Sequence, residues 1–152
     1  MKKIVLACCA LALTLSAQAQ WKPVGDKIKT DWATKVDPKS VLPEYPRPLM
    51  ERADWVNLNG EWEYAIKPKG AAIPASYDGN ILVPFAVESS LSGVQKEVGE
   101  NNELWYQRSF SVPSSWKNKD VMINFGAVDW KADVFINDVP VSYTHLRAHE
   151  TD

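Results

Sequence analysis

The stretch Gly60-Glu-Trp-Glu-Tyr-Ala-Ile-Lys-Pro68 decides the fold class of this chain. Its tryptophan, tyrosine and isoleucine alternate with its two glutamates, and a period of two is typical of a strand with one buried face. Asn59 and Gly60 permit a tight turn or bulge ahead of this stretch, and Pro68 to Gly70 ends it. The pattern therefore predicts a half-buried strand here.

Five further stretches carry β-forming residues in alternation or in short runs, separated by Pro, Gly and Asn. They are residues 81–83, 104–112, 121–125, 132–136 and 139–141. Asn137 and Asp138 form a candidate two-residue turn between the last two. No window longer than a turn or two has helical spacing. This pattern predicts an all-β fold, namely an antiparallel β-sandwich or jelly roll.

Composition bounds the functional class. The chain has 152 residues, 45% of them hydrophobic and 24% charged, with a formal net charge of −2. Such a chain has room for one ordinary domain and is too apolar to be disordered. It has no basic field to attract nucleic acid. Its seven Trp, five Tyr and four Phe either fill a core or form a sugar- or partner-binding surface.

Residues 1–19 have the layout of a secretory signal peptide. Lys2 and Lys3 precede an apolar run, and small residues stand at the two positions that a signal peptidase reads. The run is shorter than the about 20 residues that cross a bilayer. We expect cleavage after Ala19 and export to the periplasm or the extracellular space, with a lipoprotein as the minor alternative. Both cysteines, Cys8 and Cys9, lie in this segment, so the mature chain has no disulfide or thiol nucleophile.

Residues 20–48 show little periodicity and contain five prolines. Because Pro fixes φ and biases the residue before it away from helix, this segment is predicted to be an extended arm. We expect the arm to lie over the domain surface, with Trp21, Trp32 and Tyr45 as its candidate anchors.

The sequence carries no recognisable catalytic constellation. Its two histidines, His145 and His149, match neither a zinc-protease motif nor a serine-hydrolase elbow. The carboxylate pairs on 61 and 63 and on 129 and 133 could be weighed for glycoside hydrolysis, but outward strand positions carry charge by default. No catalytic residue, metal site or cofactor is therefore expected.

Arg108 departs from the apolar pattern of its stretch. One interpretation is that its stem packs along the apolar face while its head reaches water or a carboxylate. The other is a guanidinium held for a ligand or a partner domain.

Six segments of the chain occur in a characteristic order. They are Tyr45–Pro48, Trp55–Trp62, Val83–Gly93, Leu104–Phe110, Val112–Trp116 and Asn124–Asn137. Together they resemble the N-terminal domain of glycoside hydrolase family 2 enzymes, the β-galactosidase and β-glucuronidase group, over about residues 30–141. The resemblance implies a jelly-roll sugar-binding domain that precedes an immunoglobulin-like domain and a (β/α)₈ barrel. In the family, the barrel carries both catalytic glutamates and hydrolyses β-glycosides with retention.

A (β/α)₈ barrel needs roughly 250 residues, so no catalytic residue can be carried over to this chain. We expect the chain to be an inactive, non-catalytic domain of an exported β-glycosidase. The implied partners are a β-glycoside, met through the parent enzyme, and the immunoglobulin-like and barrel domains. Neither nucleic acid nor, after signal cleavage, a membrane is expected as a partner. The alternative function is a stand-alone carbohydrate-binding module without hydrolase activity.

The loop from Pro84 to Gly93 is the best candidate site, because the matching loop of related enzymes approaches the mouth of the barrel. Glu88, Ser89 and Ser90 could offer a carboxylate and two hydroxyls to a sugar at the substrate rim. The alternative, which is slightly favoured, is a surface loop stabilised by turn hydrogen bonds.

The resemblance also sets domain limits. Residues 49–141 are expected to form a partial sandwich, with Trp55, Trp62, Trp105 and Trp116 in its core. Family members continue there with a Gly, a His and a Gly-Gly-Tyr, whereas residues 142–152 have no such glycines and no strand alternation, and we expect this tail to be non-native.

Overall fold

The computed structural model describes residues 21–126, 128 and 131–144. In this part of the chain the regular elements are five β-strands and four short 3₁₀ helices. All strand pairs are antiparallel. The predicted β-rich, antiparallel character is therefore confirmed.

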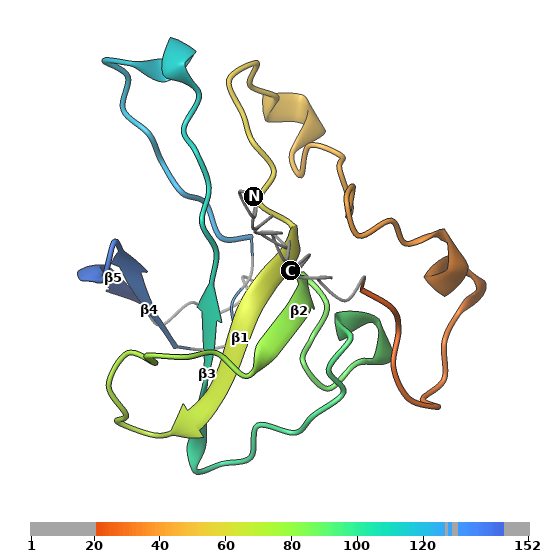
Figure 1. Ribbon diagram of the computed structural model, residues 1–152. Coiled ribbons are helices and arrows are strands. Elements are labelled where there is room, and N and C mark those ends of the chain that lie inside the picture. The colour runs from red at the N-terminus through yellow and green to blue at the C-terminus, as the bar shows by residue number, and fades with distance from the viewer. Residues whose placement is uncertain (1–20, 127, 129–130, 145–152) are drawn as a thin grey trace, which may run out of the picture.

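Three strands form the main sheet. They are β1 (Gly60–Pro68), β2 (Gly79–Val83) and β3 (Asn102–Gln107), in the order β2-β1-β3 (Figure 1). β1 is central, and its register sets Trp62 opposite Ile81 and Tyr64 opposite Tyr106. This register places Ala65, Leu82 and Trp105 on one face of the sheet, and Trp62, Tyr64, Ile66, Ile81, Val83, Leu104 and Tyr106 on the other.

That face carries the hydrophobic core. Tyr64, Ile81 and Val87 are buried. Six partly buried side chains pack against them: Trp62, Ile66, Val83, Val94, Val98 and Leu104. The alternation predicted for residues 62, 64 and 66 is confirmed, because burying apolar area favours one side of the pleat over the other.

The opposite face meets a two-stranded hairpin, β4 (Ala132–Ile136) and β5 (Val139–Thr144). The Trp105 ring of β3 lies 6.0 Å from the Phe135 ring of β4, between centroids. The predicted turn between the hairpin strands is confirmed, since Asn137 and Asp138 have φ values of 49° and 63°. Pairing continues to Thr144, past the expected limit at residue 141.

One expected strand is shorter than predicted, and another does not form. β3 ends at Gln107 and residues 108–112 lie outside the ladder, as do residues 121–125. Figure 1 shows this part of the chain leaving the sheet and returning around η4 (Ser114–Trp116). The apolar side chains of these two stretches are exposed: Phe110, Val112, Val121, Met122, Ile123 and Phe125. Alternation alone does not make a strand, because no described segment pairs with these backbones.

The N-terminal arm is extended, broken only by η1 (Asp31–Lys35) and η2 (Pro48–Met50). It runs beside the sheet and enters β1 (Figure 1). Two of its three predicted anchors hold: the Trp21 indole donates to Leu91, and the Tyr45 ring lies 4.8 Å from that of Trp55. Trp32 is 71% exposed and is not an anchor.

The four tryptophans expected in the core have separate roles. Only Trp62 joins the core cluster. Trp55 packs on the arm, Trp105 packs on the hairpin, and the Trp116 indole donates to the Asp54 carboxylate at 3.2 Å. All four are half-buried, so the expectation of a common core is wrong for three of them. Trp105 joins the hairpin to the sheet, whereas Trp55 and Trp116 join segments that lie outside it.

Candidate functional site

The rim loop, residues 84–93, connects the end of β2 to the long segment before β3. The Val83–Pro84 peptide is cis. Phe85 N–H donates to the Leu82 carbonyl at 3.1 Å, so the chain turns directly after the strand. Val87 is 2% exposed and packs in the core cluster. One buried side chain thus fixes the loop at its centre.

The two serines at 89 and 92 organise the second half of the rim loop. Ser89 Oγ accepts from Ser92 N–H at 3.2 Å and caps η3 (Ser90–Ser92). Ser92 Oγ, fully buried, lies 2.7 Å from the Ser89 carbonyl and accepts from Val94 N–H at 3.0 Å. Gly93 ends the turn with φ of 81°, a conformation that favours glycine. The hydroxyl of Ser89 is therefore engaged within the loop.

Ser90 points inward. Its side chain is 3% exposed, and its Oγ donates to the carbonyl of Val24 in the arm. In turn, Val24 N–H donates to the Ser90 carbonyl at 3.1 Å. This hydroxyl joins two segments of the chain, and burial keeps it away from the surface of the domain.

Glu88 is the predicted site residue whose side chain is exposed. Its backbone carbonyl accepts from Lys27 Nζ at 2.9 Å. Its charge acts on Tyr106: burial raises the pKa of that phenol, and the negative charge of Glu88 raises the pKa further. The structure brings Glu88, Ser89 and Ser90 together on one loop, where the side chain of Glu88 is exposed, that of Ser89 is half-buried and that of Ser90 is buried.

Aromatic and basic groups that the sequence did not link to the loop lie around Tyr106. The Tyr106 ring meets Trp62 edge-on, with centroids 6.5 Å apart. The Arg108 guanidinium is 6.0 Å from the Trp62 ring. These residues come from β1 and from the chain after β3. Only the strand register brings them together, and no sequence motif signals it.

The Arg108 guanidinium bonds to the backbone just before β1. Its Nη1 donates to the Leu58 carbonyl at 2.6 Å and to the Asn59 carbonyl at 2.9 Å. Among the described residues, the acceptors of the guanidinium are thus two backbone carbonyls. Arg108 acts as a brace at the start of β1, beside Gly60, whose added Cβ would lie 3.3 Å from Nη1.

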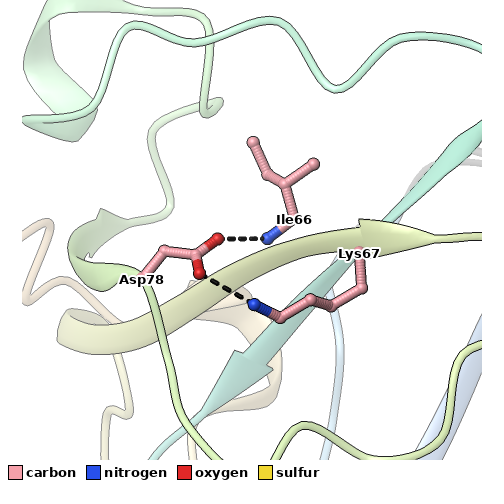
Figure 2. Close-up of polar contacts among 3 residues, drawn as sticks. All are labelled: Ile66, Lys67 and Asp78. Carbon is pink, nitrogen blue, oxygen red and sulfur yellow. Dashed lines mark hydrogen bonds and ion pairs between the residues drawn. The ribbon is translucent and has the colours of Figure 1, made fainter.

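A second polar group lies beside β1, where its pairing with β2 ends (Figure 2). The Asp78 carboxylate accepts from Ile66 N–H at 2.8 Å and from Lys67 Nζ at 2.9 Å. The hydrogen bond from Lys67, then that from Ile66, lowers the pKa of Asp78. Ile66 pairs with β3 but lies beyond the end of the pairing with β2, and the carboxylate accepts from its N–H there, which is a structural use rather than an acid–base one.

The remaining chemical candidates form no site in the part of the chain that the structure covers. Glu61 and Glu63 are exposed on the sheet, and Asp133 forms an exposed ion pair with Lys131 at 3.7 Å. Asp129, His145 and His149 lie outside the described residues. Among the described ones, no group of His, Cys, Asp and Glu is arranged to hold a metal ion, and no helix is long and apolar enough to cross a membrane.

Comparison with known proteins adds no relative. No protein-family model matches the chain, and no curated protein matches it.

Proposed function

We propose that this chain is a non-catalytic β-sandwich domain of the jelly-roll type, from an exported glycoside hydrolase of family 2. In this proposal it positions its rim loop beside a catalytic barrel carried elsewhere in the parent enzyme. The ordered motifs of the sequence motivate the family. The antiparallel sheet, with a core on one face and a hairpin against the other, is compatible with that architecture.

The rim loop carries the proposal. Its serine hydroxyls are engaged in internal bonds, and Val87 fixes it to the core. A loop built in this way holds its shape without a ligand and presents one carboxylate, that of Glu88. This suits a rigid edge that completes a neighbour's site better than a site that binds sugar alone, which usually needs several convergent polar groups.

Two measurements test the proposal. The chain is assayed on aryl β-galactosides and β-glucuronides, and it is mixed with a family 2 β-glycosidase from which the N-terminal domain has been deleted. We expect no turnover by the chain alone and saturable binding to the deleted enzyme. Turnover by the chain alone, or no binding to the deleted enzyme, would overturn the proposal.

A stand-alone carbohydrate-binding module is the second candidate, and one observation favours it. Trp32 is 71% exposed, and exposed indoles can stack on sugar rings. Lys35 Nζ lies 4.1 Å from the centroid of this ring. Titrating galactosides and glucuronides against tryptophan fluorescence distinguishes the candidates. Saturation that disappears in Trp32→Ala would favour the module, while a flat titration would favour the structural domain.

Export is part of the proposal. Residues 1–20 lie outside the described residues, so the proposal depends on the sequence pattern alone. N-terminal sequencing of the chain recovered from a secreting host should begin at Gln20. Recovery of an intact N-terminus in the cytoplasm would contradict export, and recovery beginning at a lipidated cysteine would identify the lipoprotein.

A further inference from the structure

The start of the described chain lies against the rim loop. We call residues 21–27 the strap. Trp21 Nε1 donates to the Leu91 carbonyl at 3.2 Å, and Lys27 Nζ donates to the Glu88 carbonyl at 2.9 Å. Between these two contacts lies the reciprocal pair of bonds that joins Val24 and Ser90. The strap is thus bonded to the loop at three points along its length, across more than sixty residues of sequence.

The strap also packs closely against the loop. A Cβ added to Gly93 would lie 3.0 Å from the Trp21 ring and 3.6 Å from the Lys22 carbonyl. On the strap side, a Cβ on Gly25 would overlap the side chain of Gln95. Glycines at both places let the two backbones approach each other without a side chain between them.

We infer that the strap is a positioning element for the rim loop and fixes the direction in which Glu88 meets its partner. Val87 holds the loop from the core side and the strap holds its other side, so the loop is clamped between two elements. The inference relies on the proposed function only for the partner of Glu88. The contacts that carry it need neither sugar nor a barrel.

The clamp depends on few side chains. All four acceptors in these strap–loop bonds are backbone carbonyls, whereas the side-chain donors are Trp21, Ser90 and Lys27. Ser90 is buried and Lys27 is exposed. Losing a buried bond leaves a polar group unsatisfied, which costs more than losing an exposed one. Trp21 and Ser90 are therefore the residues to change.

Hydrogen exchange of backbone amides in the full chain tests the clamp. In Trp21→Ala and Ser90→Ala we expect the amides of residues 86–95 to exchange at least about tenfold faster. The amides of β1 and β3 should keep wild-type rates. Trp32→Ala is the matched control, since this arm tryptophan is 71% exposed and its substitution should leave the loop unchanged.

Trp21→Phe protects the test against a variant that does not fold, because phenylalanine keeps most of the ring packing and removes only the indole donor. It should give a smaller acceleration confined to the same amides. Wild-type exchange of residues 86–95 in both Ser90→Ala and Trp21→Phe would overturn the inference. So would equal acceleration across the whole sheet.

A second readout follows Glu88 itself. The charge of Glu88 raises the pKa of the Tyr106 phenol, so Glu88→Gln should lower that pKa. If the strap directs Glu88, Trp21→Ala should also lower the pKa of Tyr106 in a chain that remains folded. The measurement is a titration of ¹³C-labelled tyrosine rings by NMR. An unchanged Tyr106 titration in Trp21→Ala, beside a lowered one in Glu88→Gln, would contradict the inference without bearing on the proposed function.

Discussion

At the scale of single residues, two charged side chains hydrogen-bond to backbone groups beside β1 that have no strand partner there. Arg108 braces the two carbonyls before β1, and Asp78 bonds to the Ile66 amide beside the same strand. Backbone groups in half-buried places need such partners. The sequence marked one of these residues as an exception to the apolar pattern, but neither of its two interpretations named a backbone acceptor.

Replacing Arg108 should therefore destabilise the fold. Arg108→Ala removes charged hydrogen bonds to two carbonyls and is expected to lower the free energy of unfolding by about 2–3 kcal/mol. Arg108→Lys keeps a cationic donor and should lose clearly less. Urea denaturation followed by tryptophan fluorescence measures both variants. An Arg108→Ala chain with the wild-type midpoint would show that the brace contributes nothing.

Asp78 gives the fold a pH dependence. Its pKa is lower in the folded state than the ordinary value, because of Lys67 first and the Ile66 amide second. A carboxyl of this kind stabilises the fold above its unfolded pKa, about 3.9 for Asp, and the contribution is lost as pH falls through the folded pKa.

Asp78→Asn should accordingly lower the melting temperature at pH 7 and differ less from wild type near pH 3. Melting curves of both chains across this range provide the measurement. Asp26→Asn, at an exposed position of the strap, is the control and should leave the curve unchanged. A difference that grows toward acid would contradict the assignment.

At the scale of elements, one ring contact among the described side chains joins the β4–β5 hairpin to the main sheet, between Phe135 and Trp105. Its own turn and ladder make it a local unit, and an isolated hairpin is marginally stable in water. The hairpin should therefore open before the sheet does.

Phe135→Ala tests this order of opening. We expect faster amide exchange throughout β4 and β5, with β1 to β3 unchanged, because β3 loses a ring contact but keeps its ladder with β1. Val139→Ala is the control, since Val139 is 59% exposed. If the hairpin amides of Phe135→Ala were as protected as those of the wild type, other contacts would hold the hairpin.

At the scale of the whole molecule, the exposed apolar residues outside the strands are the main feature that favours aggregation. Phe110, Val112, Ile123 and Phe125 are each between 37% and 48% exposed. Extended, apolar and unpaired segments are templates for association with other chains. The chain is therefore expected to aggregate when it is expressed alone.

Ile123→Lys should reduce this aggregation. The side chain is exposed, so the stability change should stay within about 0.5 kcal/mol while a charge interrupts the apolar segment. Ile28→Lys is the matched control, because Ile28 is fully exposed and lies in the arm, away from this segment. Light scattering against concentration checks the outcome. Equal scattering by wild type and both variants would locate the association elsewhere.

The sequence by itself determined the β-rich class, the central strand with its buried face, the hairpin turn at 137–138 and the extended arm. These follow from local rules: the period of two, the turn-forming residues and the fixed φ of proline. Because such rules act within a few residues, each of these features could be predicted from its own segment.

Only the tertiary structure decided which alternating segments became strands and which polar groups of the rim loop stayed free. Residues 121–125 alternate as well as β1 does, yet nothing in the described chain pairs with them. Ser89 and Ser90 are neighbours of the same residue type, but the hydroxyl of Ser90 donates a hydrogen bond to a carbonyl far away in the chain. A strand needs a partner and a hydroxyl needs an acceptor, and a distant segment of the chain supplies each of them.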